Sequence, residues 1–266
     1  MSGKNAVQDA FRKFSLEGRV IIVTGAGSGI GRAAALLFAE RGATVVVAEI
    51  NEANGAKVAA EIRNAGGRAG FIRTDVTQEK DAEAMVQFAV SEFGGLHGAF
   101  NNAGISGTGG PVTEMALSAW QRAVDINQNG VFLCMKYEIA HMLKHGGGSV
   151  VNTSSGAGIT GSPNMPEYVT TKHAVIGLTR AAAVDFSGKG VRVNALLPGA
   201  SETPMLLGTF ARDPLVKSIV TSGHPIGRLA DPVEIAEGAA WLLSDAASYV
   251  TGALLCVDGG YTAKSA

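Results

Sequence analysis

Residues 20–31 read VIIVTGAGSGIG, and this stretch decides the fold. The β-branched run VIIV at 20–23 predicts a short buried strand. The glycines at 25, 27, 29 and 31 predict a tight turn that opens a helix of small residues. Glycine at such a turn lets a phosphate approach the backbone, and the amino end of the helix offers free N–H groups to an anion. The stretch therefore predicts a phosphate-binding turn after the first strand.

The rest of the chain alternates short apolar runs with longer helical patterns. The predicted strands cover residues 19–24, 44–49, 68–73, 97–101, 148–153, 191–197 and 253–258. The predicted helices cover residues 29–41, 52–65, 78–93, 118–145, 166–187 and 232–244. Strands that are apolar on both faces and joined by helices form a parallel sheet covered on both sides. We therefore predict an α/β fold, a doubly wound parallel sheet of about seven strands with helices on both faces (a Rossmann fold).

No repeat, low-complexity tract or linker marks the beginning of a second domain. Residues 1–15 lack the apolar core of a signal peptide and are interpreted as an N-terminal arm, and residues 16–266 as one catalytic domain. Within it, residues 200–228 are interpreted as a substrate lid. The apolar stretch MLLGTF at 205–210 fits a lid that closes over the substrate, and equally a plain surface helix.

Composition narrows the class of protein. Hydrophobic residues make up 46% of the 266 residues, charged residues 17%, and the net charge is −1, so nothing favours binding to nucleic acid or an anionic membrane. Cys134 and Cys256 lie in apolar runs and are interpreted as buried free thiols of a cytoplasmic protein. His141 and His145 have a spacing that can bind metal, but no acidic or cysteine ligand accompanies them, so we predict no metal site.

The second predicted strand ends at Glu49, eighteen residues after Gly31. A carboxylate there can accept hydrogen bonds from both hydroxyls of an adenosine ribose. It would also repel a 2′-phosphate, because two like charges about 4 Å apart cost about 4 kcal/mol at an effective dielectric constant of 20. Arg32 is near, but we expect it to face solvent on the first helical turn. The sequence therefore favours NAD over NADP as the cofactor.

Ser155 follows a predicted strand, and Tyr168 and Lys172 lie one turn apart on the next predicted helix. Hydride transfer at a carbonyl needs an acid/base beside the oxygen. The pKa of a tyrosine, ordinarily near 10, would have to fall to about 7, which requires about 4 kcal/mol in favour of the phenolate. We expect the ammonium of Lys172 and a cationic nicotinamide ring to supply it, and Ser155 to hydrogen-bond the substrate oxygen. A Tyr/Lys pair alone usually marks an exposed helix face; the glycine turn favours the functional interpretation.

In the order of these motifs the chain resembles the short-chain dehydrogenase/reductase family, from residue 16 to residue 262. The matching motifs are TGAGSGIG at 24–31, Asp75-Val76, NNAG at 101–104, Asn127 in DINQNGVF, Ser155, Tyr168 with Lys172, Pro198-Gly199, and the terminal VTGALLCVDGG. The gap of three residues between Gly25 and Gly29 resembles the shorter, NAD-preferring dehydrogenase branch rather than the epimerase/dehydratase branch.

The resemblance implies a cofactor site spread along the chain. Asp75 and Val76 would hold the adenine, and Asn101, Ala103 and Gly104 would line the middle of the cofactor. The full implied set is Gly25, Ser28, Gly29, Ile30, Gly31, Glu49, Asp75, Val76, Asn101, Ala103, Gly104, Tyr168, Lys172, Pro198 and Thr203.

The same resemblance places Pro198 and Thr203 beside the nicotinamide and gives Lys172 a hydrogen bond to its ribose. Asn127 would kink its helix, anchor a water and complete a proton relay from Lys172. Ser201 departs from the family, since related sequences usually carry an aliphatic residue there. The implied catalytic residues are Asn127, Ser155, Tyr168 and Lys172.

The sequence thus predicts an oxidoreductase that transfers a hydride between NAD(H) and a secondary alcohol or ketone, and the resemblance implies a homotetramer. The segments 105–112, 156–166 and 200–228 carry no cluster of charges for a sugar phosphate or a carboxylate, and the apolar 205–210 run indicates a neutral, partly hydrophobic substrate. The resemblance implies cyclic or aromatic secondary alcohols or small polyols. One alternative, an NADPH-dependent carbonyl reductase, is opposed by Glu49. A non-catalytic nucleotide-binding sensor is opposed by the intact catalytic positions, and an isomerase or dehydratase by the glycine spacing.

Overall fold

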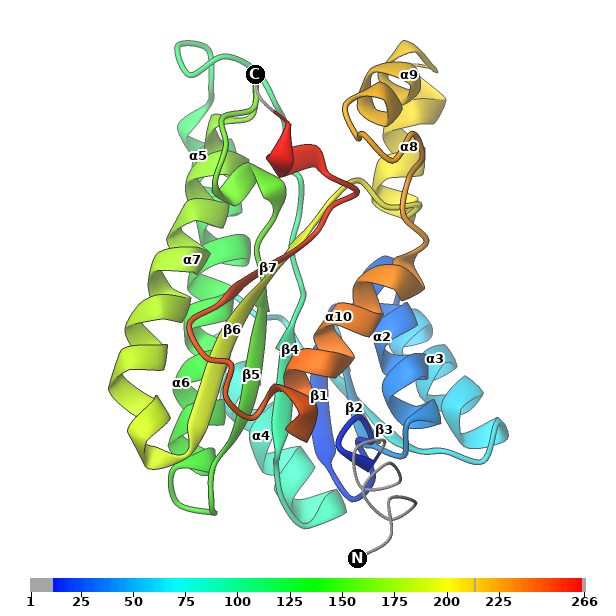
Figure 1. Cartoon of the computed structure of the whole chain (residues 1–266), viewed down its shortest axis with the longest axis vertical. Helices are drawn as coiled ribbons and strands as arrows, with labels where there is room; N and C mark the ends of the chain where they lie inside the picture. Colours follow the sequence, from blue (N-terminus) through cyan, green and yellow to red (C-terminus); the bar gives the residue numbers. More distant parts are fainter. Residues whose placement is uncertain (1–11, 213, 265–266) are drawn as a thin grey trace, which may run out of the picture.

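The computed structural model describes residues 12–212 and 214–264, and in them the chain forms one sheet of parallel strands (Figure 1). The strand order is β3-β2-β1-β4-β5-β6-β7. The strands are β1 Val20–Thr24, β2 Thr44–Glu49, β3 Arg68–Arg73, β4 Gly98–Asn101, β5 Gly148–Thr153, β6 Val191–Pro198 and β7 Leu254–Val257. Each of the predicted strands is present, so the predicted doubly wound fold is confirmed.

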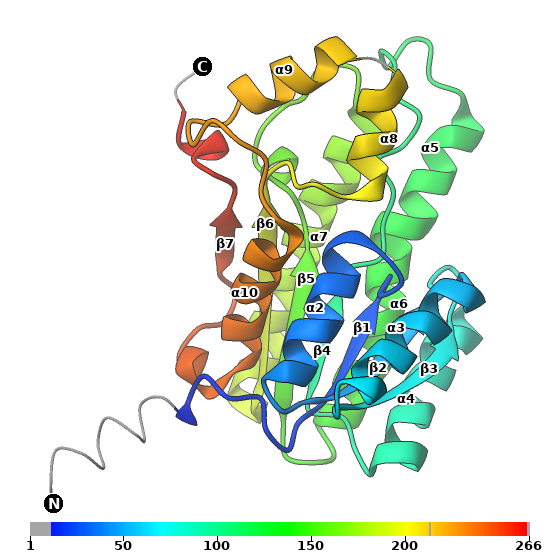
Figure 2. The same cartoon turned by 90° about the vertical axis from the view of Figure 1, so that its right-hand side faces the viewer.

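Helices cover both faces of the sheet (Figures 1 and 2). On one face lie α2 Gly29–Glu40, α3 Glu52–Asn64 and α10 Pro232–Leu243. On the other lie α4 Glu79–Phe93, α6 Gly130–Met142 and α7 Pro166–Phe186. The apolar runs of the strands therefore face helices on both sides, as β1 shows: Ile21 and Val23 pack on the side of α2, and Val20 and Ile22 on the side of α4. Full burial of each such side chain contributes about 1.5–3 kcal/mol.

The order of the strands fixes the place of the site. From β1 the chain runs outward to β2 and β3, and the next strand, β4, returns to the other side of β1. Ligands of such sheets bind at the carboxyl ends of the strands where the order reverses. The crevice between the ends of β1 and β4 is therefore the expected position of the site.

The helix predicted over 118–145 is present as α5 Leu117–Ala123, a π-helical turn Val124–Asn129, and α6, and the π-helical turn contains Asn127, where the resemblance implied a kink. In the lid segment, α8 Pro204–Arg212 covers the 205–210 run, for which a surface helix was one of the two interpretations, and a second helix, α9 Pro214–Ser222, was not predicted. Both helices stand beyond the carboxyl ends of the strands (Figure 2).

At the start of the chain, most of the predicted arm, residues 1–11, lies outside the described residues, while Leu16 is already fully buried. Among the helices that the structure describes, none is long and apolar enough to span a bilayer.

Candidate active site

The glycine turn packs tightly against the NNAG segment that follows β4. Gly25 has a φ of +64°, and a Cβ there would lie 2.9 Å from the Cα of Ala103. A Cβ at Gly31 would lie 2.1 Å from the carbonyl oxygen of Gly25. Only glycine fits at these positions, and the resulting cradle at the amino end of α2 fits a pyrophosphate.

Thr24 and Asn102, which were not predicted as site residues, connect the end of β1 to the NNAG segment after β4 by hydrogen bonds. The Thr24 hydroxyl oxygen accepts the backbone N–H groups of Asn102 at 3.0 Å and of Ala103 at 3.1 Å. The Asn102 side chain in turn donates to the Thr24 carbonyl at 3.2 Å. The doubled asparagine of NNAG was the signal that could have revealed this contact.

Glu49 reaches back from the end of β2 to the glycine turn. Its Oε2 accepts the N–H of Gly27 at 2.9 Å, and its Oε1 accepts the N–H of Asn51 at 3.0 Å. Arg32 is exposed, as expected, and forms a surface ion pair of 2.6 Å with Glu61. Arg73, beside Glu49 in the sheet, faces the carboxylates of two other residues, Glu52 at 3.8 Å and Asp81 at 3.7 Å.

Two of the expected cofactor residues turn their side chains into the core. A Cβ at Gly130 would lie 2.8 Å from Cγ2 of Val76, which is buried. The Asn101 amide donates to Glu138 Oε2 at 2.9 Å and to Asn152 Oδ1 at 3.0 Å. At these two positions a cofactor can therefore meet only the backbone. Asp75, by contrast, lies at the surface of the crevice and accepts hydrogen bonds from Thr77.

The network behind Asn101 was not foreseen from the sequence. Glu138 of α6 is fully buried, and burial raises the pKa of its carboxyl from 4.5 to about 7, although the hydrogen bond from Asn101 acts in the opposite direction. Asn152 continues the network to Thr179 at 3.0 Å. A glutamate that follows Lys136 and Tyr137 in a helix is ordinarily expected to be exposed, so the sequence near Glu138 did not predict that it is buried.

The structure brings Ser155, Tyr168 and Lys172 together at the ends of β5 and α7. The Ser155 side chain lies near enough to the Tyr168 phenol to lower its pKa, and Lys172 Nζ lies 5.6 Å from the centre of the Tyr168 ring. Lys172 is buried, and its Nζ donates to the Thr153 carbonyl at 2.9 Å. The Ser154 hydroxyl donates to the Lys172 carbonyl at 2.8 Å and so fixes α7 to the same strand.

The electrostatics of this group differ from the prediction. Burial raises the pKa of Tyr168, and the Ser155 side chain lowers it only in part. Burial also lowers the pKa of Lys172 from 10.5 to about 8, because the charged form loses hydration. The protein alone thus leaves the phenol a weak acid, and it holds an ammonium that is easily deprotonated beside it.

Asn127 lies in the π-helical turn, where the resemblance implied a kink. Its side chain accepts the Ile105 N–H at 2.8 Å and donates to the Ile105 carbonyl at 2.9 Å. It also donates to the Thr171 hydroxyl at 3.3 Å. A Cβ at Gly104 would lie 3.1 Å from Asn127 Oδ1 and 3.6 Å from Lys172 Nζ, so Asn127 and Lys172 flank the same glycine.

The segment after β6 closes over the crevice. Pro198 is buried at the end of the strand, and a Cβ at Gly29 would lie 3.0 Å from Cγ2 of Thr203, so Thr203 lies against the glycine turn. The Ser201 hydroxyl donates to the Gly199 carbonyl at 3.2 Å, which accommodates a polar residue where the family usually has an aliphatic one.

His224 and Tyr261, neither of which was predicted to take part, support this segment from behind. His224 Nε2 accepts the Ala200 N–H at 3.0 Å, while Nδ1 lies 2.8 Å from the Val220 carbonyl oxygen. The Tyr261 ring stacks on His224 with a centroid distance of 5.1 Å. A Cβ at Gly156 would lie 2.8 Å from the same ring, so the end of the chain meets the residue that follows Ser155.

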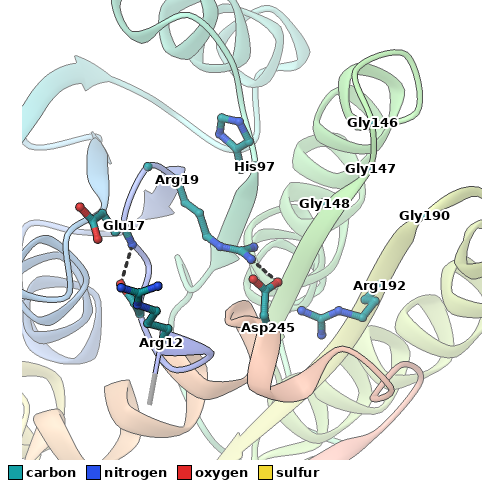
Figure 3. Close-up of a pocket in the computed structure, with 12 residues that line it drawn as sticks. Arg12, Glu17, Arg19, His97, Gly146, Gly147, Gly148, Gly190, Arg192 and Asp245 are labelled. Atoms are coloured by element: carbon teal, nitrogen blue, oxygen red, sulfur yellow. Dashed lines mark hydrogen bonds and ion pairs between the residues drawn. The ribbon is translucent and has the colours of Figure 1, made fainter. Parts of the chain in front are cut away.

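A cavity of about 740 Å³ lies at the opposite edge of the sheet, at the amino ends of the strands (Figure 3). Arg192 donates to the carbonyls of Leu242 at 2.8 Å and Ser244 at 3.1 Å, where α10 ends. Arg19 donates to the Leu243 carbonyl at 3.2 Å and pairs with Asp245. Cations at the carboxyl end of a helix stabilise its last carbonyls. The arginines of this cavity are therefore explained by helix capping.

The described residues contain no group of three or more potential metal ligands. His141 and His145 stack with a centroid distance of 4.0 Å, and His145 Nδ1 lies 2.8 Å from the His141 carbonyl oxygen. The pair is thus bound to its own helix end, without a third ligand within reach in this part of the chain.

The fold and this group of residues together define a dinucleotide-binding oxidoreductase of the Rossmann type. A family model described as enoyl-(acyl carrier protein) reductase matches residues 25–262. The chain belongs to the short-chain dehydrogenase/reductase family, and it is an oxidoreductase.

Relatives of the same family and solved structures match this chain over nearly its whole length. The chain is 51% identical over 249 residues to 2,5-dichloro-2,5-cyclohexadiene-1,4-diol dehydrogenase of Sphingobium indicum, covering 93% of this chain and 98% of that one. It is 47% identical over 246 residues to cyclohexanol dehydrogenase of Acinetobacter sp., covering 92% and 96%. A crystal structure described as a putative NAD(P)-dependent gluconate 5-dehydrogenase from Beutenbergia cavernae, with NADP bound at low occupancy, superposes with a TM-score of 0.89 at 38% identity, covering 95% and 100%.

Proposed function

We propose that the protein is an NAD-dependent dehydrogenase that oxidises cyclic secondary alcohols to ketones, or catalyses the reverse reduction. The observation that carries the proposal is the buried side chain of Lys172, whose Nζ lies 5.6 Å from the centre of the Tyr168 ring, with Ser155 near enough to that phenol to lower its pKa. Relatives at 51% and 47% identity are named as dehydrogenases of a cyclohexadienediol and of cyclohexanol, which supports a ring-shaped alcohol.

In this mechanism Tyr168 is the acid/base. The glycine turn and the residues after β4 would hold NAD⁺, which would supply the acceptor for the hydride of the carbinol carbon. Ser155 holds the substrate oxygen, and Tyr168 takes the hydroxyl proton. The positive charge of Lys172 favours the phenolate, and it must act against the burial that raises the pKa of Tyr168. Because the pKa of Lys172 is about 8, this side chain can itself pass a proton on near neutral pH.

Asn127 would complete the route to solvent. Both ends of its side-chain amide are bound to Ile105, so the side chain holds the loop after β4 while the backbone of the π-helical turn remains for a relay water. The role is carried over from the family, and the shared neighbour Gly104 supports it, since Asn127 and Lys172 lie on either side of that residue.

The proposed cofactor residues are those that the sequence predicted, with backbone contacts at Val76 and Asn101. The preference for NAD rests on Glu49, whose carboxylate lies at the glycine turn, and on the ion pairs that engage Arg32 and Arg73. A 2′-phosphate would meet the charge of Glu49 without a guanidinium ready to neutralise it. A similar structure holds NADP, so an NADPH-dependent carbonyl reductase is the alternative to be tested.

The proposed assembly is a homotetramer in the cytoplasm. Phe132 of α6 and Val184 of α7 are exposed apolar side chains, 49% and 85% accessible, which supports contact with another copy. Cys134 and Cys256 are both free thiols, which suits a reducing compartment; Cys134 is buried as predicted, but Cys256 on the edge strand β7 is exposed, so the prediction that it is buried was wrong. Light scattering of the purified protein would give the mass of the assembly.

A spectrophotometric screen tests the proposal. NAD⁺ reduction is measured over cyclic, aromatic and open-chain secondary alcohols, and both NAD(H) and NADP(H) are titrated into the pure protein. We expect turnover of cyclic alcohols and at least tenfold tighter binding of NAD(H), about 1.4 kcal/mol. Equal affinities, or tighter NADP(H) binding, would contradict the role of Glu49. Absence of turnover on every alcohol and ketone would contradict the proposed reaction.

A further inference from the structure

Glu167 lies directly before Tyr168 in the first turn of α7, and its side chain is fully buried. One carboxylate oxygen, Oε1, accepts the backbone N–H of Thr108 at 2.9 Å and that of Gly109 at 3.1 Å. The mechanism described above does not use this group. A buried carboxylate is costly unless hydrogen bonds compensate for lost hydration. The contact with the 105–110 loop, ISGTGG, is therefore its main compensation.

The loop is shaped around that oxygen. Gly107, Gly109 and Gly110 have φ angles of +83°, +74° and +118°, which residues other than glycine rarely adopt. Neighbouring N–H groups that converge on one oxygen form an anion-binding concavity. A Cβ at Gly107 would lie 2.3 Å from Glu167 Oε1. The backbone thus approaches the carboxylate too closely for a side chain at this position.

Two further contacts fix the ends of the loop. Ile105 exchanges hydrogen bonds with the side chain of Asn127, and the Gly110 N–H donates to the Asn164 carbonyl at 2.9 Å. Asn164 belongs to the segment that leads into α7. The Gly110–Asn164 bond therefore joins the segments 105–112 and 156–166, two of the three that the sequence analysis related to the substrate, and Glu167 fixes the first of them to α7 next to the catalytic tyrosine.

We propose that Glu167 is a positioning residue for the substrate: by holding the 105–110 loop against α7, it sets the wall of the alcohol site beside Tyr168 and determines how well a ring-shaped alcohol is held. The inference rests on the proposed function, because it assumes that the alcohol binds beside Tyr168. Glu167 takes no part in proton transfer. Its second oxygen, Oε2, is buried and has no hydrogen-bond partner among the described residues, so one oxygen carries the contact with the loop.

Three variants test the proposal. Glu167→Ala removes the acceptor, Glu167→Gln keeps an oxygen that can accept both N–H groups, and Gly107→Ala pushes the loop away from an intact carboxylate. The matched control is Glu138→Gln, since Glu138 is equally buried but binds Asn101 rather than the loop. The kcat and KM values are measured with saturating NAD⁺ for cyclohexanol and for 2-propanol, and NAD⁺ affinity is measured by titration.

In Glu167→Ala and Gly107→Ala we expect the KM for cyclohexanol to rise at least tenfold, while kcat, the KM for 2-propanol and NAD⁺ affinity change less than threefold. Glu167→Gln and Glu138→Gln should stay within threefold of the wild type in all constants. An equal loss of kcat for both alcohols at unchanged KM would overturn the proposal, because it would place Glu167 in the chemistry. Wild-type constants in Glu167→Ala would overturn it as well.

Amide hydrogen exchange supplies a readout that does not need turnover. The amides of Thr108 and Gly109 should exchange at least tenfold faster in Glu167→Ala than in the wild type, and at the wild-type rate in Glu138→Gln. If the wild type oxidises neither alcohol, the proposed function fails and this measurement decides the loop contact alone. Unchanged protection of both amides in Glu167→Ala would then overturn the positioning role.

Discussion

The two edges of the sheet use polar groups in different ways. At the amino edge, arginines line a cavity of about 740 Å³, but Arg19 and Arg192 are bonded to the last carbonyls of α10. At the carboxyl edge, Lys172 is buried and Tyr168 is partly buried, and burial lowers the pKa of Lys172 and raises that of Tyr168. A small cavity of about 110 Å³ at this edge is lined by the segments after β6 and α9, including Ala200 and His224, and not by Ser155, Tyr168 or Lys172. The larger cavity thus marks a structural contact, whereas the shifted titratable groups mark the candidate site.

Tyr168→Phe is the most direct test of the proposal that the carboxyl edge, and not the amino edge, carries the catalytic residues. The variant removes only the hydroxyl that carries the proton, so kcat should fall at least about 100-fold, while unfolding and NAD⁺ binding stay near the wild type. Ser155→Ala should be nearly as damaging, since it removes a hydrogen bond that strengthens as charge develops on oxygen. Steady-state kinetics and cofactor titration are the measurements. Retention of a tenth of the wild-type kcat in Tyr168→Phe would exclude Tyr168 as the acid/base.

Lys172→Met should give the next largest effect, and it depends on pH. Alcohol oxidation needs the phenolate, so the rate should rise with pH, and loss of the ammonium should move the apparent pKa of this rise upward by at least about one unit. At pH 7 the rate should therefore drop about tenfold or more. An unchanged pH profile would show that a group other than Lys172 tunes Tyr168. Lys172→Arg should restore activity only in part, because a planar guanidinium has a different geometry.

The pKa of Lys172 also predicts the direction in which Lys172→Met changes the free energy of unfolding. The pKa of Lys172 is about 8 in the folded protein and near 10.5 in the unfolded chain, so the unfolded chain binds more protons between these values. The contribution of Lys172 to the free energy of unfolding therefore becomes less unfavourable as the pH rises from about 8 to about 10.5. Below pH 8 the wild type carries the full cost of a buried ammonium, up to about 3 kcal/mol. Lys172→Met should thus be the more stable protein at pH 7 and lose that advantage by pH 10, as thermal unfolding would show.

The smallest effect on activity is expected at the amino edge. Arg192→Met removes hydrogen bonds to the Leu242, Ser244 and Val250 carbonyls, and Leu242 and Val250 keep donors from Ser149 and Asn194, so the free energy of unfolding should fall by about 2 kcal/mol. The kcat should stay within twofold of the wild type, because the variant lies at the opposite ends of the strands. Urea unfolding and steady-state kinetics check both parts. A large loss of activity without loss of stability would give the amino edge a function that helix capping does not provide.

The sheet could be predicted because each strand has a recognisable local sequence pattern. Runs such as VIIV in β1 and TVVVAE in β2 are apolar on both faces, and glycine or helical patterns bound them on either side. The π-helical turn at Asn127 could not be predicted in this way, since a turn with one extra residue leaves the apolar pattern of α5 and α6 nearly continuous. In α8 the apolar run was visible, but the same pattern fitted a lid or a surface helix.

The candidate site was predictable where a residue acts through its type and spacing. Tyr168 and Lys172 are one helical turn apart, and Glu49 ends a strand, so their positions follow from local structure. Glu167 and Glu138 are different, because each is buried only by contacts distant in sequence: Glu167 with residues 58 and 59 positions away, and Glu138 with Asn101, 37 positions away. Such contacts depend on the packing of the whole fold.

Arg19, at the start of β1, donates to a carbonyl 224 residues further along the chain and pairs with Asp245, 226 residues away. At a synthesis rate of about 5–20 residues per second, a ribosome makes the second partner roughly 10–45 s after the first. During that interval the outer side of α2 lacks α10, which covers it in the finished core. The face of α2 that packs on α10 is therefore among the last parts of this core to be covered during synthesis, and until then it is an apolar surface open to aggregation.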